Sequence, residues 1–194
     1  MLATTFRNEN WVGSFFAAVF VLVVGLAAGI AIAEWINAMP AEATPAVGTG
    51  RPHRGDPAGW ELFAFILRRN MTVFLMLLLG IVSAGLVTVV VLLGNGIAVG
   101  QLIGFARVSG MSLADVAYLL LPHGVLELGA LCVAGAVGLR GIRLAVGLSA
   151  IDRTAFGSLR LGTVLVFGLV ALAAAAAVEA FVTVEIAESL RGKW

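Results

Sequence analysis

Long apolar runs alternate with short polar segments along the chain. Four runs cover residues 12–34, 72–93, 123–144 and 161–184, and each is about as long as the ~20 mostly apolar residues that a helix needs to cross a membrane. Segment 37–59 differs, because it holds four of the five prolines together with glycines and charged residues. This pattern predicts membrane-spanning helices over the four runs and an extramembrane loop over 37–59.

The first run is predicted to be a retained helix. It is longer than the roughly 7–15 apolar residues of a secretory signal, so we expect it to stay in the membrane. Trp11 and Trp35 flank it, as aromatic residues do at the two membrane interfaces. Gly25 and Gly29 lie about one turn apart, which predicts a face that packs closely against another helix.

A helix lying on the membrane surface is predicted before the second run. It covers about residues 57–69, and Asp56-Pro57 resembles an N-cap followed by proline at the first helical position. Trp60 lies near its start and two arginines lie at its end. These features are typical of an interfacial helix.

Turn signals interrupt the chain after the second run. Gly94-Asn95-Gly96 is one such signal, so Asn95 is interpreted as a turn residue. Ser109-Gly110 is another, and Ser112 followed by Asp115 resembles a capping box at the start of a helix.

The segment between these signals and residue 123 is predicted to be irregular. Its two halves are each too short to cross the bilayer, so we expect a broken or re-entrant helix around residues 96–121. Three glycines recur at every fourth position in its first half, and we expect them to approach a neighbouring helix closely: Gly96, Gly100 and Gly104.

Composition changes the picture by excluding a water-soluble globule. Hydrophobic residues make up 61% of the 194 residues and charged residues 12%, whereas soluble domains have roughly 45–50% and about 25%. The predicted fold class is therefore all-α, a polytopic membrane helix bundle of four to five spans in a single domain over residues 1–194. A formal net charge of +1 provides no basic field for nucleic acid, so the lipid bilayer is the first predicted partner.

Ionisable residues inside apolar runs are the candidate functional groups, because each costs about 2.5–3.5 kcal/mol at membrane depth. His123 and Glu127 are four residues apart, so a helix would place them on one face, within contact distance. They can simply satisfy each other or cap the helix that restarts after Pro122. They can also bind a partner, gate a path or handle protons.

Three further polar residues are candidates with competing structural roles. Glu179 can reach the interface or face the bundle, near the end of the last run. Arg107 can pair with Glu127 or Asp115 if the broken segment folds back, or extend to the headgroups. Asn95 is the third, and Asp115 is interpreted as a cap.

Catalytic and cofactor signatures are not found in the sequence. It contains no nucleotide-binding loop, no ordered Ser-His-Asp set and no His-Glu-x-x-His pattern, so we predict neither an enzyme nor a cofactor. Zinc normally takes three or four protein ligands, and His53 in the proline-rich loop is the only other histidine. We therefore predict no metal site.

Several short motifs resemble a known family. Asn95-Gly96 with Gly100, the stretch Leu121-Pro-His-Gly-Val-Leu-Glu-Leu128, and Ala134-Gly135-Ala136 resemble the stage II sporulation protein M family of bacterial multi-pass membrane proteins, over about residues 60–145. The resemblance implies an all-helical protein, usually of five crossings, in the bacterial cytoplasmic membrane. In spore formers the namesake is a scaffold that localises cell-wall hydrolases, and other relatives accompany bacteriocin export. It also makes Asn95, His123 and Glu127 the site positions.

The leading hypothesis is a non-enzymatic membrane scaffold that organises partner proteins. The expected partners are other membrane or cell-envelope proteins, with a homo-oligomer as an alternative. A permease-like component working with a separate ATPase is the first alternative function, and an intramembrane metallohydrolase using His123 is the second.

Overall fold

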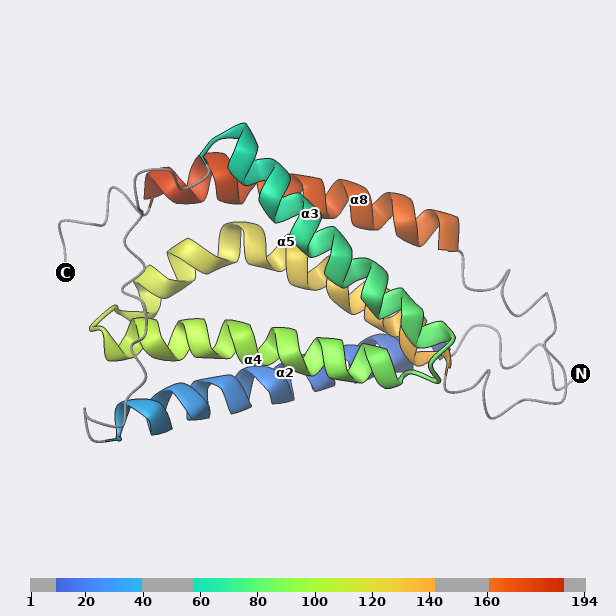
Figure 1. Ribbon diagram of the computed structural model, residues 1–194, viewed down its shortest axis with the longest axis horizontal. Helices are drawn as coiled ribbons and strands as arrows, with labels where there is room; N and C mark the ends of the chain where they lie inside the picture. The colour runs from blue at the N-terminus through green and yellow to red at the C-terminus, as the bar shows by residue number, and fades with distance from the viewer. Residues whose placement is uncertain (1–9, 40–57, 142–160, 187–194) are drawn as a thin grey trace, which may run out of the picture.

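The structure, a computed structural model, describes residues 10–39, 58–141 and 161–186. These residues form helices and turns (Figure 1). The helices are α2 (Asn10–Asn37), α3 (Trp60–Leu78) with the 3-10 turn η2 (Leu79–Ile81), α4 (Leu86–Val108), α5 (Leu113–Leu139), and α8 (Leu161–Val178) with the π-helix η3 (Glu179–Thr183). Five of them are long and apolar enough to cross a membrane. This confirms the predicted all-α bundle, and five is the larger of the two predicted numbers of spans.

The tightest helix contact joins α2 and α4, which run parallel. A methyl group added at Gly29 would collide with the carbonyl oxygen of Ile97, and one added at Gly100 would collide with that of Leu26. Gly25 and Gly96 approach the opposite backbone in the same way. Only residues without a side chain permit this approach, so the predicted glycine faces of the two helices are confirmed, and they face each other.

The chain turns back between α3 and α4 at residues 82–85, which the hydrophobic pattern did not predict. Gly85 has a φ of 79° and Ala84 has a φ of 50°, both in the left-handed region that ends a helix sharply. The predicted span 72–93 is therefore wrong. Residues 72–81 continue the predicted surface helix, and together they form one span, Trp60–Ile81. Residues 86–93 are the beginning of α4.

The predicted break around 96–121 is also wrong. Gly94-Asn95-Gly96 lies inside α4, and α5 continues through Pro122 without interruption. The turn at Ser109-Gly110 is confirmed, and Gly110 has a φ of 92°. Ser112 caps α5 as predicted, because its Oγ accepts a hydrogen bond of 3.2 Å from the Asp115 backbone N–H.

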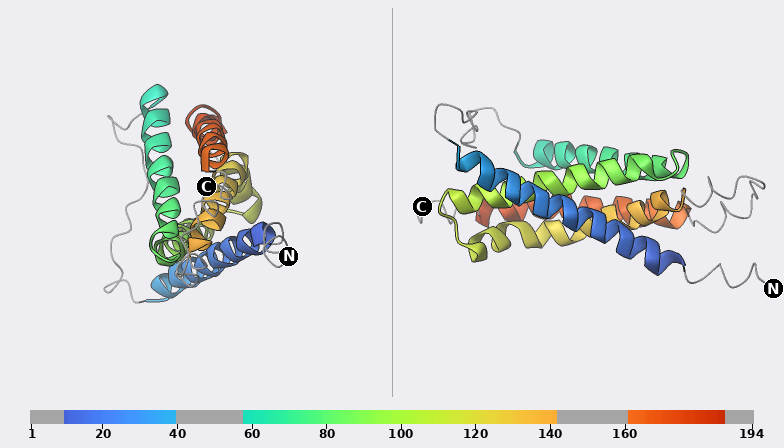
Figure 2. Two further views of the ribbon diagram at one scale, coloured as in Figure 1. Left: turned by 90° about the vertical axis from the view of Figure 1, so that its right-hand side faces the viewer. Right: turned by 90° about the horizontal axis from the view of Figure 1, so that it is seen from below.

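Fully buried apolar side chains fill one end of the bundle, near the α3–α4 turn. The large ones, Phe74, Leu77, Leu92, Leu131 and Leu172, come from four helices, and Ala18 of α2 adds a fifth. The end-on view in Figure 2 places α2 and α8 on opposite sides of this core. Away from the turn, α3 and α4 diverge (Figure 1), and the interior is no longer filled by apolar side chains alone.

Candidate functional site

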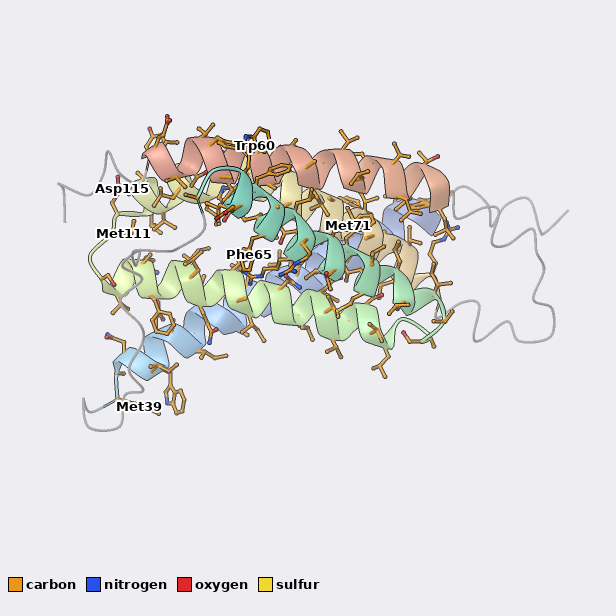
Figure 3. The ribbon with its side chains drawn as sticks, turned by 45° about the horizontal axis from the view of Figure 1, so that its top comes forward. Met39, Trp60, Phe65, Met71, Met111 and Asp115 are labelled. Carbon is orange, nitrogen blue, oxygen red and sulfur yellow. The ribbon has the colours of Figure 1, made fainter. Side chains whose placement is uncertain are left out.

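A cavity of about 260 Å³ lies where α3 and α4 diverge. It is lined by residues from α3, α4, α5 and η3. Figure 3 shows Phe65, one of the lining residues, in the space between α3 and α4. Half of the lining is apolar, and the polar part consists of Arg69, Asn70, Asn95, His123, Glu127 and Glu179.

The polar lining lies deep within the spans. At 1.5 Å per residue, Asn70 is about 15 Å along α3 from Trp60, and Glu127 is about 21 Å along α5 from Leu113. The 19 residues of α3 span about 29 Å and the 27 residues of α5 about 41 Å, so each helix can cross the ~30 Å hydrocarbon core of a bilayer. The cavity is therefore a polar site at membrane depth, where charged groups are costly and usually functional.

The cavity opens sideways. Its exposed lining residues are Phe65 and Arg69 on α3 and Ala98 and Leu102 on α4. Asn70 and His123, in contrast, are only 7% and 8% exposed. The opening therefore lies between α3 and α4, on the side that faces lipid in a membrane.

Glu127 of α5 interacts with polar and charged side chains of α3 and η3. Its carboxylate accepts a side-chain hydrogen bond from Asn70 of α3 and is attracted by the Arg69 guanidinium. It is repelled by the carboxylate of Glu179 across the cavity. Among the described residues, no basic side chain forms an ion pair with either carboxylate.

His123 is held by the π-helix rather than by Glu127. Its Nδ1 lies 3.2 Å from Thr183 Oγ1, and that hydroxyl lies 3.4 Å from the Val178 carbonyl oxygen. If the hydroxyl donates to Val178, the Nδ1–H of a neutral imidazole donates to Thr183, which makes Nε2 an acceptor. π-Helical turns are rare and often occur at functional sites, and this one supplies both Thr183 and Glu179.

The structure brings together four of the predicted site residues. His123, Glu127, Asn95 and Glu179 all line the cavity, so Glu179 faces the bundle rather than the interface. The interpretation of Asn95 as a turn residue is wrong. It lies within α4, and its side-chain amide donates a 2.8 Å hydrogen bond to the Val91 carbonyl.

Sequence reasoning missed Arg69 and Asn70. The pattern placed them at the end of a surface helix, outside the membrane. The signal that could have found them is the apolar stretch on both sides, which the structure joins into a single span, Trp60–Ile81. A cation and an amide in the middle of such a span face the bundle or a cavity.

Arg107 does not line the cavity, so of its two expected roles the pairing with Glu127 or Asp115 is wrong, and the side chain lies exposed at the end of α4. Its Nη1 lies 3.6 Å from Glu34 Oε1, at the ends of α4 and α2, and the two side chains are 48% and 58% exposed. We expect Arg107→Ala to change the free energy of unfolding by less than about 1 kcal/mol, because exposed ion pairs contribute little. Thermal unfolding in detergent checks this, and a large loss of stability would show that the pair is structural.

The described residues contain no group of three or more His, Cys, Asp or Glu side chains that could hold a metal ion. His53, the other histidine, lies outside the described residues, as do most of the predicted loop 37–59 and residues 187–194.

Five apolar helices, four of which line a polar cavity at membrane depth, define a multi-pass membrane protein. The family model for stage II sporulation protein M matches residues 16–184, and the chain belongs to that family. An uncharacterized protein of Methanocaldococcus jannaschii is 35% identical over 78 residues, which are 40% of this chain and 44% of that protein. The match thus spans less than half the length of this relative. No solved structure matches the chain.

Proposed function

We propose that this protein is a non-enzymatic subunit of the bacterial cytoplasmic membrane that binds and organises other membrane or cell-envelope proteins. The cavity between α3, α4, α5 and η3 is its recognition site. One observation carries this proposal: polar side chains from four helices converge at membrane depth around a space that opens toward lipid.

A sideways opening suits a partner that is itself in the membrane. The rim has apolar side chains from both helices, Phe65 and Leu102, which can pack against another helix. The interior has room for roughly eight water molecules or one long side chain. Polar contacts formed there are specific, because any unmatched polar group at this depth is left without a partner.

The chemistry of the lining also favours binding over catalysis. The described residues that line the cavity include no serine, threonine, cysteine, tyrosine or lysine. The hydroxyl that contacts His123, that of Thr183, is not part of the lining and is engaged by the imidazole Nδ1 and the Val178 carbonyl oxygen. The remaining groups can accept, donate and pair charges, which are the interactions of a recognition site.

Photocrosslinking in native membranes tests the proposal. We expect p-benzoylphenylalanine in place of Phe65, at the mouth, to capture a defined membrane protein, and Glu127→Gln to abolish that adduct. The same probe in place of Phe16, which is 64% exposed on α2, is the matched control and should not give this adduct. Equal adducts from both positions, or an adduct that Glu127→Gln leaves unchanged, would contradict a role for the cavity.

A permease-like component is the second candidate. The observation that favours it is the position of Glu127 and His123 near mid-span, with Glu179 in the same cavity, because transport proteins place ionisable residues of ion and substrate paths there. Purified protein in liposomes separates the two functions. Flux that requires Glu127 would replace the scaffold with a transporter.

A further inference from the structure

The charges in the cavity are unbalanced. Its lining has two carboxylates, on Glu127 and Glu179, and one guanidinium, on Arg69. The remaining polar groups are amides and the imidazole of His123. With both carboxylates ionised, the interior therefore carries an excess of one negative charge, which an apolar surrounding makes costly unless a proton or a cation balances it.

Because of where these charges lie, no described cationic side chain is paired with the two carboxylates of the interior. Arg69 is on the exposed rim, between α3 and α4, whereas Glu127 and Glu179 face each other across the cavity from α5 and η3. Asn70 donates a hydrogen bond to the Glu127 carboxylate, but no described basic residue forms an ion pair with Glu127 or Glu179. A cation that enters between the carboxylates would replace their repulsion by two attractions.

The imidazole of His123, which is mostly buried but lines the cavity, points to the same ligand independently of the glutamates. His123 is only 8% exposed, and its Nδ1 is engaged by Thr183. Its Nε2 has no hydrogen-bond partner among the described residues, although the ring lines the cavity. With Nδ1 engaged by Thr183, Nε2 is the ring atom that is left to accept a hydrogen bond from a ligand.

From these observations we infer that the cavity is a subsite for one lysine side chain on a transmembrane helix of the partner. This inference rests on the proposed function and names the feature that is recognised. An ammonium group has three N–H donors, and the cavity supplies a matching set of acceptors in Glu127, Glu179 and His123. The four methylenes of the stem would contact the apolar lining beside them, which includes Ile66 and Val99.

The route into the cavity favours a helix-borne cation over one from water. The mouth opens between two spans toward lipid, and its α3 residues Phe65 and Arg69 lie about 8 Å and about 14 Å along the helix from Trp60, the nearest helix end. At that end, Trp60 contacts Phe63 and Phe181 edge to face, with ring centroids 5.5 Å and 5.1 Å apart, and so joins α3 to η3 by aromatic packing. A lysine in the middle of a partner helix reaches this depth directly.

Binding of matched transmembrane peptides tests the inference. The full chain in phosphatidylcholine nanodiscs would be titrated with a labelled Leu/Ala-rich helix that has lysine, norleucine or glutamate at its centre. We expect the lysine peptide to bind at least about tenfold more tightly than the norleucine peptide, because removing one partner of a buried charge pair weakens binding by that much or more. The glutamate peptide should bind most weakly.

Variants of the two carboxylates assign the preference to the cavity. Glu127→Gln and Glu179→Gln, separately and together, should reduce the lysine preference to less than about twofold. Glu34→Gln, which removes a carboxylate at the exposed ends of α2 and α4, is the matched control and should retain it. Thermal unfolding and gel filtration identify variants that are not folded, and either single variant that folds is sufficient for the test.

Each outcome decides one point. Equal binding of the lysine and norleucine peptides, or a preference that survives both substitutions, overturns the inference. Addition of n-butylammonium, which has the lysine side-chain chemistry, should displace the lysine peptide, whereas n-butanol should not. If n-butylammonium stabilises the protein but no lysine peptide binds, the ligand is a free amine and the helix-borne source is wrong. A Phe65 adduct lost in Glu127→Gln, without any lysine preference, would preserve the proposed function and reject this inference.

Discussion

Replacing Gly100 with leucine is expected to separate α2 from α4 and destabilise the whole bundle. A Cβ at Gly100 would collide with the Leu26 carbonyl oxygen and lie 2.9 Å from the Ile30 backbone nitrogen. Because both obstacles are backbone atoms, neither can be relieved by a side-chain rotation, and the helices must move apart. Overpacking typically costs about 1–3 kcal/mol, and we expect the upper end of that range because the obstacles are backbone atoms.

Thermal unfolding of the purified protein in detergent measures this effect, together with gel filtration for the integrity of the fold. Gly94→Leu is a matched control, because Gly94 lies on the same helix with nothing within 4 Å of its added Cβ. We expect a marked fall in the Tm for Gly100→Leu and little change for Gly94→Leu. Equal Tm values for the two variants would show that α2 and α4 are not held together by their glycines.

Phe74→Ala is expected to have the second large effect on stability. Phe74 of α3 is fully buried, and its ring occupies the space that a side chain at Gly168 of α8 would need. Removing the ring leaves a void between α3, α5 and α8, at a cost of about 3–5 kcal/mol in the free energy of unfolding. Phe16→Ala, at a 64% exposed position, should cost far less.

A second substitution tests whether the ring and the glycine act as a pair. In Phe74→Ala/Gly168→Leu, the new leucine can fill part of the void, so we expect the double variant to be more stable than Phe74→Ala alone. Gly168→Leu by itself should be destabilising, because the leucine and the ring compete for one space. Strictly additive losses would contradict direct packing of Phe74 on Gly168.

The number of spans could be predicted from the sequence, but the position of the first hairpin could not. Apolar runs reveal helices because a bilayer requires them, whereas the turn at 82–85 is itself apolar apart from Ser83. Backbone dihedrals of Ala84 and Gly85 define that turn, and hydropathy does not report them. Because this turn was not predicted, the surface helix before it was predicted too short and the segment after it was predicted to be broken.

Glycine and proline also have different meanings in lipid and in water. Gly96 resembled part of a turn, but its role is close approach to Leu22 and Gly25 of α2. Pro122 resembled a break, but α5 continues through it, as membrane helices tolerate when neighbouring groups satisfy the freed carbonyl. Rules from soluble proteins therefore predicted interruptions at two places where the helix is continuous.

The site was predictable where its residues interrupt an apolar run and not where they border one. His123, Glu127 and Glu179 could be identified because charge or imidazole at membrane depth requires an explanation. Arg69 and Asn70 were predicted to lie at the membrane interface because the second span was predicted to begin at residue 72, whereas it begins at Trp60. That these groups meet in one cavity depends on helix packing, which a single sequence does not specify.

The parallel pairing of α2 with α4 also determines the order in which the chain can assemble. Parallel neighbours need a returning segment between them, so α2 leaves the ribosome while the glycines of α4 are still unmade. Until α3 has crossed and residues 93–101 of α4 have been synthesised, Gly25 and Gly29 lack the backbone against which they pack. The first span is therefore held by its own hydrophobicity during translation, and a nascent chain that stops before α4 would lack the partner for that first helix.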